Sequence, residues 1–428
     1  MIRNFSQHIA RPLVLVAALS FLAFPLSLAA QTAAKPESVG MSSARLATLA
    51  TTLEQYSKDG RVAGGVAMVA RRGKVVFSHA WGARDHEANS PMRQDALFRI
   101  ASQSKAITSV AIMMLQEDGK LLISDPVSKF IPEFANTTVA VAKDSGGYDV
   151  VKAKRQITIR DLLTHTAGIG YGTGTAKDKW EAAGVTGWYL SNRDETIQDT
   201  VKKIAALPMD AHPGEKWIYG YATDILGAVV EKASGQAFDQ FLAGRIFGPL
   251  EMNDTAFYVP QGKAGRLAAV YSAKDGKIER APDPGLGVGQ GAYVTGPRKN
   301  FSGGAGLVST ASDYLRFLQM IANGGTLDGK RLLSRKSVEL MIADHLRNIA
   351  YTSDGQGFGL GFTVTKDVGS RGVPSSIGEF GWGGAYHSTY WVDPKEQLVV
   401  VYFTQLIPAG NIDDYGRLRA LVYSAIID

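Results

Sequence analysis

The chain has 428 residues, with 46 lysines and arginines against 40 aspartates and glutamates, and it contains no cysteine. Without cysteine it forms no disulfide and carries no lipid on an N-terminal cysteine, so a hydrophobic core must hold the fold, and the chain is long enough for a large one. The positive charges are scattered and no basic stripe carries interleaved aromatic residues, so we expect no nucleic-acid partner.

The first thirty residues have the order of a secretory signal peptide. A short basic start precedes an apolar run over 12–30, with small residues around Ala29 and Ala30. The alternative is an uncleaved membrane anchor, but the run is short for one and contains Pro25. We predict a signal peptide over 1–30, a periplasmic or secreted mature chain, and no stable membrane insertion after cleavage.

Hydrophobic periodicity predicts strands near both ends of the mature chain and helices in its middle. In chain order we expect a helix over 44–58, a hairpin of 64–70 and 75–81, a helix over 102–118, a strand-rich excursion over 137–156, a short helix over 159–165, a long loop over 168–193, helices over 194–207, 222–234 and 237–246, a second hairpin within 262–280, a loop over 283–304, helices over 310–323 and 334–343, strands over 361–365, 376–382, 389–392 and 398–404, and a last helix over 413–427. Strands joined mainly by hairpins make an antiparallel sheet.

The expected fold class is therefore α/β of the α+β kind, an antiparallel sheet flanked by helices with an inserted helical lobe. We place the sheet lobe at about 37–100 plus 305–428 and the helical lobe at about 101–304. Both belong to a single unit over 31–428.

The helix expected from Ser102 is apolar or weakly polar nearly all round, which is typical of a protein interior. Between Arg99 and Leu115 its one charged side chain is Lys105, one turn beyond Ser102. A lysine is rarely buried without a partner, and a cation is disfavoured at the positive end of a helix dipole, so a neutral amine is favoured. A neutral amine on the same helix face as a serine hydroxyl is a base beside a nucleophile. The alternative is that Ser102 caps the helix and Lys105 points to solvent.

A second candidate is the segment from Pro213 to Tyr221, where a Pro-Gly turn leads into aromatic residues just before a helix. Tyr219, held near a lysine, is suited to move protons. The alternative is a packed tyrosine whose hydroxyl is bound to backbone.

A third candidate is the glycine-rich segment from Glu379 to Ser388. Glycines in a strand permit close backbone approach, and free N–H groups there can face a reacting carbonyl. We expect the amides of Ser102 and Ala385 to form an oxyanion hole. The alternative is a bulge or a sheet edge.

These segments together resemble the motifs of the penicillin-recognising serine hydrolases, which include class C β-lactamases, DD-peptidases and family VIII carboxylesterases. The family pattern is S-x-x-K, then Y-x-N or a variant, then K-T-G, H-T-G or W-G-G. It is matched in order by Ser102-Gln103-Ser104-Lys105, Tyr219-Gly220-Tyr221 and Trp382-Gly383-Gly384. Stretches at 162–168, 249–255 and 303–309 are also similar, so the resemblance covers essentially the whole mature chain.

The resemblance implies a nucleophile, Ser102, with Lys105 and Tyr219 sharing the general-base and general-acid work. It implies an oxyanion hole from the amides of Ser102 and Ala385. The substrate contacts that we expect from this and from neighbouring residues are Tyr221, Trp382, Gly383, Gly384 and His387.

Two residues depart from the family pattern. Tyr221 stands where the family has an asparagine that bonds a substrate amide. Trp382 stands where β-lactamases and DD-peptidases have a cation near the substrate carboxylate, and an indole offers apolar surface and one donor instead. This favours neutral acyl substrates and the esterase branch. For His387 a structural role is the alternative, and His165 is expected to cap its turn.

The prediction is an exported serine carboxylesterase that acts on a small-molecule ester, or on a β-lactam, through an acyl-enzyme. One alternative is β-lactamase or D-amino-acid peptidase activity on the same site, and another is a non-catalytic homologue that binds peptidoglycan. The sequence contains no G-x-S-x-G motif, so it does not support the nucleophile elbow of α/β-hydrolases. No histidine–carboxylate cluster has metal-ligand spacing and no glycine-rich phosphate loop is present, so we expect no metal and no cofactor.

Overall fold

The main sheet has eight strands in the computed structural model, which describes residues 1–2 and 34–428. Its order is β12-β13-β14-β15-β16-β1-β2-β3, and each neighbouring pair is antiparallel. The N-terminal strand β1 therefore lies beside the C-terminal strand β16, with Val66 opposite Phe403. The predicted signal peptide over 1–30 falls, apart from its first two residues, outside the described part of the chain.

The strands of the main sheet are β1 (Gly64–Arg71), β2 (Lys74–Asp85), β3 (Ser90–Pro91), β12 (Gln356–Phe358), β13 (Thr363–Thr365), β14 (Phe380–Gly384), β15 (Ser388–Asp393) and β16 (Leu398–Phe403). Four small two-stranded sheets pair β4 (Phe98–Arg99) with β9 (Val308–Ser309), β5 (Thr138–Ala142) with β6 (Tyr148–Lys152), β7 (Tyr271–Lys274) with β8 (Lys277–Arg280), and β10 (Thr326–Leu327) with β11 (Lys330–Arg331).

The central strands are buried on both faces because successive side chains of a strand point to opposite sides. In β1, Val66 and Met68 belong to one hydrophobic cluster, whereas Ala67 and Val69 belong to another. Every residue of β1 and of β16 is buried. Both faces of the sheet therefore need a covering layer, and helices supply it.

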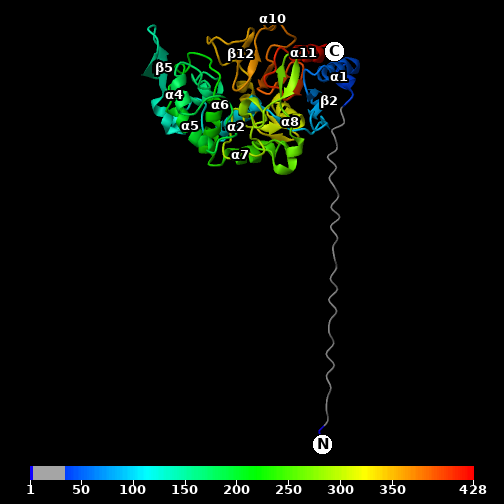
Figure 1. Cartoon of the computed structure of the whole chain (residues 1–428), viewed down its shortest axis with the longest axis horizontal. Coiled ribbons are helices and arrows are strands. Elements are labelled where there is room, and N and C mark those ends of the chain that lie inside the picture. Colours follow the sequence, from blue (N-terminus) through cyan, green and yellow to red (C-terminus); the bar gives the residue numbers. More distant parts are fainter. Residues whose placement is uncertain (3–33) are drawn as a thin grey trace. The chain divides into compact units, whose positions relative to one another are not determined.

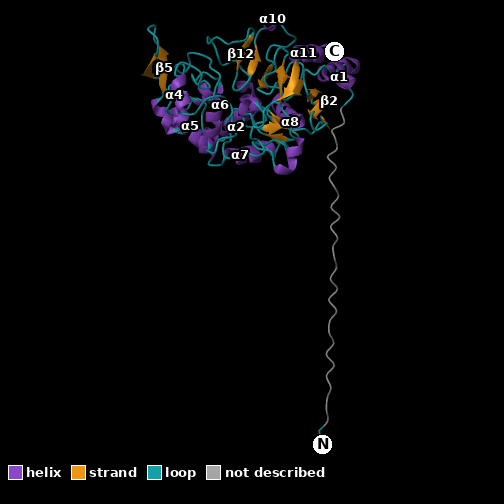
Figure 2. Ribbon diagram, in the orientation of Figure 1, coloured by secondary structure: helices purple, strands orange, loops and turns teal. Residues whose placement is uncertain are grey.

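Two groups of helices cover the sheet (Figures 1 and 2). The first and last helices, α1 and α11, lie together on one face, while α2 and α8 share the larger hydrophobic cluster of the other. The helices are α1 (Ser43–Lys58), α2 (Ser104–Glu117), α3 (Ile159–Leu163), α4 (Lys177–Ala182), α5 (Ile197–Ala205), α6 (Ala222–Ser234), α7 (Phe238–Leu242), α8 (Ala311–Ala322), α9 (Arg335–Met341), α10 (Val368–Arg371) and α11 (Asp414–Ser424). The predicted fold class, an antiparallel sheet flanked by helices, is confirmed.

The structure differs from the expected elements mainly where the elements are short. Helix α2 begins at Ser104 because Ala101–Gln103 first form a 3-10 turn. The loop expected over 168–193 contains α4, and the helix expected over 237–246 is α7 followed by one π-helical turn. Strand β12 and helix α10 were not predicted, because three or four residues carry too little periodicity.

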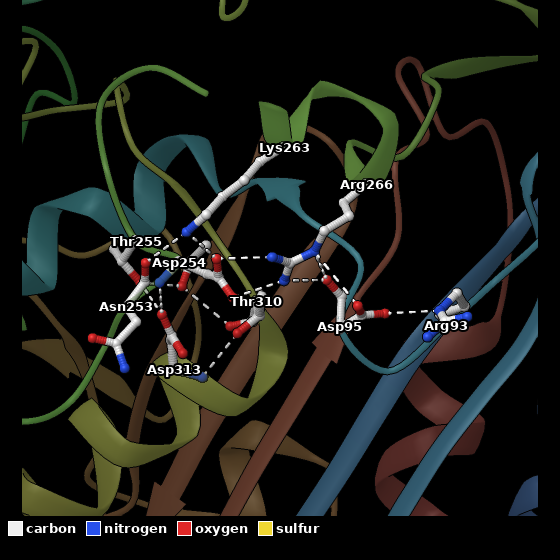
Figure 3. Close-up of polar contacts among 10 residues, drawn as sticks. Arg93, Asp95, Asn253, Asp254, Thr255, Lys263, Arg266, Thr310 and Asp313 are labelled. Atoms are coloured by element: carbon white, nitrogen blue, oxygen red, sulfur yellow. Dashed lines mark hydrogen bonds and ion pairs between the residues drawn. The ribbon is translucent and has the colours of Figure 1, made fainter. Parts of the chain in front are cut away.

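A polar network around Asp254 fixes the stretch at 249–255 to the start of α8 (Figure 3). The carboxylate of Asp254 accepts hydrogen bonds from Arg266 at 2.7 and 2.9 Å and from Lys263 at 2.7 Å. Its backbone N–H and the Thr255 hydroxyl both donate to Asp313, in the first turn of α8, at 2.8 and 3.0 Å. Burial raises the pKa of the Asp313 carboxyl. In this structure the stretch therefore has a structural role, because it holds the start of α8, a helix that packs against the main sheet.

Within residues 1–2 and 34–428, none of the helices is both long enough and apolar enough to cross a membrane.

Candidate active site

Ser102 lies in the short 3-10 turn between β4 and α2. Ala101, just before it, has a φ of +42°, in the left-handed region that residues with a side chain rarely adopt. Such backbone is held by the surrounding structure and is common at functional sites. Ala101 is fully buried, so packing holds it in place.

Lys105 is almost fully buried, at 1% exposed, and its amine has three oxygen neighbours. The Nζ atom lies 2.8 Å from the Gly304 carbonyl oxygen, 3.2 Å from the Tyr171 hydroxyl and 3.4 Å from Ser102 Oγ. None of these partners is a carboxylate. The prediction that Lys105 is buried beside Ser102 rather than extended to solvent agrees with this geometry.

The Gly304 carbonyl that holds Lys105 is itself supported by a buried carboxylate. Asp224, in α6, accepts hydrogen bonds from the Gly304 N–H at 3.0 Å and from the Ser302 hydroxyl. Burial raises the pKa of the Asp224 carboxyl, and nearby Lys105 opposes that rise. Asp224 therefore sets the position of Lys105 through one residue of backbone.

Tyr219 lies against Lys105 with its ring rather than with its hydroxyl. The amine is 4.6 Å from the centroid of the Tyr219 ring. The hydroxyl accepts a hydrogen bond of 3.1 Å from the indole N–H of Trp382. The single donor of Trp382 is thus used on Tyr219, and only the apolar part of the indole is left for a substrate.

His165 packs behind Tyr219, with 4.8 Å between the ring centroids. It lies just after α3, and its backbone N–H donates to the Leu162 carbonyl, as a turn-forming residue does. Burial, with a smaller effect of Lys105, lowers the pKa of His165 well below its usual range. It is therefore a neutral packing residue.

The third motif approaches Ser102 through backbone. At Gly384 a Cβ atom would lie 2.5 Å from the carbonyl oxygen of Ile100, which excludes any side chain there. This close approach brings the hairpin between β14 and β15 against the turn that carries Ser102. Within residues 34–428, no acceptor binds the N–H of Ala385, so that amide is available.

These groups open on one cavity of about 450 Å³. The residues that line it are Ser102, Tyr171, Trp188, Tyr219, Trp382, Gly383, Gly384, Ala385, His387, Ser388, Ala409 and Tyr415. Most of them are aromatic or small, and no carboxylate is among them. In the part of the chain that the structure describes, no group of three or more metal-ligating side chains is placed to hold an ion.

The family model described as Beta-lactamase matches residues 49–422. The chain belongs to the Beta-lactamase family. This chain is a serine hydrolase of that family.

Several relatives within the Beta-lactamase family carry esterase names. Esterase EstB of Burkholderia gladioli is 32% identical, over 88% of this chain and 94% of EstB. Lovastatin esterase of Penicillium rubens is 28% identical, over 83% of this chain and 92% of its own length. The solved structure of EstCE1, described as a hydrolase with promiscuous acyltransferase activity, has a TM-score of 0.75 and 27% identity, covering 89% of this chain and 99% of that one.

Tyr221 does not lie where its motif position suggested. Its ring stacks on Trp180, with 6.0 Å between centroids and 3° between planes, and its hydroxyl donates to the Gly187 carbonyl. It is fully buried and does not line the cavity. Its ring and its hydroxyl are both bound to the 168–193 segment, so Tyr221 supports that segment instead of contacting substrate.

Two residues near Lys105 were not predicted from the sequence. Tyr171 comes from the segment 168–193, for which the sequence predicts only a long loop. Burial raises the pKa of its hydroxyl well above the usual value. Asp224 is the only carboxylate of α6 that is fully buried. A single charged residue among apolar helix positions is the signal that identifies Lys105, and the same signal could have identified Asp224.

Proposed function

We propose that this protein is an exported serine esterase that hydrolyses uncharged carboxylic esters through an acyl-enzyme on Ser102. The observation that supports the proposal is the hydrogen bond that the Trp382 indole donates to Tyr219. The indole N–H is taken by Tyr219, so the wall of the cavity at the third motif is apolar and has no cation. A substrate carboxylate placed there would lose its hydration without gaining a counter-charge. The esterase names of EstB and lovastatin esterase support the same branch.

In the proposed step Lys105 acts as the base in its neutral form. A carbonyl oxygen can only accept, so Gly304 takes one N–H of the amine, and a second N–H is directed to the Tyr171 hydroxyl. The nitrogen lone pair is then left for the proton of Ser102 Oγ. As that proton moves to Lys105, Oγ forms a bond to the ester carbonyl carbon.

The negative charge that develops on the carbonyl oxygen is stabilised by the amides of Ser102 and Ala385. Donors of this kind each lower the barrier by about 3–4 kcal/mol. When the tetrahedral intermediate collapses, the bond to the leaving oxygen breaks and the alcohol takes a proton from the Lys105/Tyr219 pair. Water then adds to the acyl group with the same pair as base, and the acid leaves Ser102.

The test is a paired assay on the purified mature protein with p-nitrophenyl butyrate and nitrocefin. We expect ester turnover that Ser102→Ala abolishes and that Ser145→Ala, in the exposed turn between β5 and β6, leaves unchanged. A serine-directed phosphonate should add one mass increment to the wild type and none to Ser102→Ala. Nitrocefin turnover equal to or above ester turnover would move the protein to the β-lactamase branch, and no turnover with no labelling would indicate a binding protein.

Export is proposed from the N-terminal sequence. We expect the mature protein recovered from the periplasm or the medium to begin at residue 30 or 31. N-terminal sequencing checks this, and an intact Met1 in that fraction would contradict it.

A further inference from the structure

His387 has a backbone conformation that is unfavourable for a residue with a side chain. It ends the tight turn between β14 and β15, where its N–H donates to the Gly384 carbonyl at 3.1 Å, and its φ is +57°. Glycine adopts this region freely. The hydroxyl of Thr404 donates to the His387 carbonyl and holds the strained residue in place. Backbone of this kind is common at functional sites, so the contacts of the side chain decide whether it has a use.

The imidazole of His387 is fixed by a buried carboxylate. Both oxygens of Asp414, which is 0% exposed, lie 2.9 Å from Nε2. Asp414 also accepts from the Tyr402 hydroxyl at 2.6 Å and from the Tyr415 N–H at 2.9 Å, so all its neighbours are donors. A carboxylate only accepts, so the ring carries its proton on Nε2. The Tyr415 ring stacks on the imidazole at 4.2 Å and 4°, which fixes the plane as well.

The other nitrogen of this ring is unused. Among residues 34–428 no group bonds Nδ1, and this atom is not shut away from solvent. The ring lines the same cavity as Ser102, next to Tyr415 and Ala409, which are uncharged. In its neutral form the ring therefore offers a lone pair of fixed direction at a cavity whose other walls are largely apolar. A lone pair in such a place is complementary to a neutral donor.

We propose that Nδ1 of His387 accepts a hydrogen bond from a hydroxyl group of the substrate, so that the site prefers esters that carry a hydroxyl over their unsubstituted analogues. The inference rests on the proposed esterase function and adds to it a substrate class. Asp414 is a positioning residue that sets the tautomer of the ring and does not touch substrate.

The experiment compares kcat/KM within two matched series of esters. On the acyl side it uses p-nitrophenyl hexanoate, 6-hydroxyhexanoate and the half-ester of adipic acid. On the alcohol side it uses benzyl butyrate and 4-(hydroxymethyl)benzyl butyrate. In one of the two series we expect kcat/KM for the hydroxyl ester to exceed that of its analogue by about fivefold or more, mainly through a lower KM. This is the gain expected from one ordinary hydrogen bond. In His387→Gly that ratio should fall to about one.

The variants separate a lost contact from a damaged fold. His387→Gly is compatible with the left-handed backbone at this position. His387→Asn is also compatible with it, so the same kcat/KM ratio can be measured in that variant if His387→Gly folds poorly. Gln397→Gly is the control, because Gln397 is an exposed residue with a φ of +50° in the next hairpin, and its ratio should equal that of the wild type.

Each other outcome overturns the inference in a recognisable way. Ester turnover without a hydroxyl preference in either series, a preference for the adipate half-ester, or a preference that survives in both His387 variants would overturn it and leave the esterase function standing. No turnover of any ester would overturn the proposed function and this inference with it.

Discussion

Replacing Gly304 by alanine tests the link from Asp224 through Gly304 to Lys105. A Cβ at position 304 would lie 2.4 Å from Asp224 Oδ2 and 2.9 Å from its Cγ, whereas ordinary contact begins at 3.4 Å. One side must therefore move by about 1 Å, and the Gly304 carbonyl that holds Lys105 moves with it. A displacement of about 1 Å at a catalytic group costs on the order of 100-fold in rate, or about 2.7 kcal/mol of barrier.

We expect Gly304→Ala to lower kcat for p-nitrophenyl butyrate by about 100-fold and to lower the free energy of unfolding by about 1–3 kcal/mol, as overpacking does. Gly244→Ala, where an added Cβ meets nothing within 4 Å, should match the wild type in kcat. In an Asp224→Ala background the same Gly304→Ala change should cost much less, because the clash is gone. An equal cost in both backgrounds, or a wild-type kcat in the single variant, would refute the link.

Further predictions concern three side chains. Tyr171→Phe removes the hydroxyl that lies 3.2 Å from the Lys105 amine, and kcat/KM for p-nitrophenyl butyrate should fall by about tenfold, the loss of one strong hydrogen bond. Trp382→Phe removes the donor to Tyr219 but keeps an aromatic wall, so kcat should fall by about fivefold with KM little changed, and a rise in KM alone would contradict the assigned contact. Although burial opposes it, hydrogen bonds led by Arg266 hold the pKa of Asp254 below its usual value. The carboxylate therefore stabilises the fold above the ordinary pKa of an aspartate, about 3.9, and ceases to do so as the pH falls through its lower folded value. The difference in free energy of unfolding between the wild type and Asp254→Asn should accordingly narrow as the pH is lowered from 5 towards 3 in denaturant titrations.

The parts of the site that the sequence predicts are residues that stand out from their immediate neighbours in the chain. Lys105 stands out because it is one cation on a helix that is otherwise apolar, and the structure buries it beside Ser102. Gly384 stands out because a strand rarely holds consecutive glycines without a close backbone approach, and Ile100 makes that approach. The roles of these residues in catalysis stay predictions until the assays are done.

The parts of the site that the sequence does not predict depend on side-chain orientations, which are set only when distant segments pack together. Tyr171 lies within the 168–193 segment and Tyr221 packs against it, yet the hydroxyl of Tyr171 faces Lys105 and that of Tyr221 faces Gly187. The pattern of residues gives no direction for either ring. The same holds for Trp382, whose donor is committed to a tyrosine from a segment far away in the sequence.

The fold shows the same division between local and distant causes. Helices α1, α6 and α8 and strands β1, β15 and β16 carry enough periodicity to be located within one or two residues, whereas β2 extends four residues beyond its expected end. The 3-10 turn at Ala101–Gln103 was not located, because its left-handed residue is an alanine, and only tertiary packing keeps an alanine there.

The position of β1 between β2 and β16 has a consequence for the order of biosynthesis. The guanidinium of Arg71, at the end of β1, donates to the Glu396 carbonyl, 325 residues away in the chain. A sheet of such high contact order closes late. The ribosome must release nearly the whole polypeptide before β16 can pair with β1 and β15. A chain stopped before residue 398 would hold every residue of the Ser102 motif and still lack the strand that joins the two halves of its sheet.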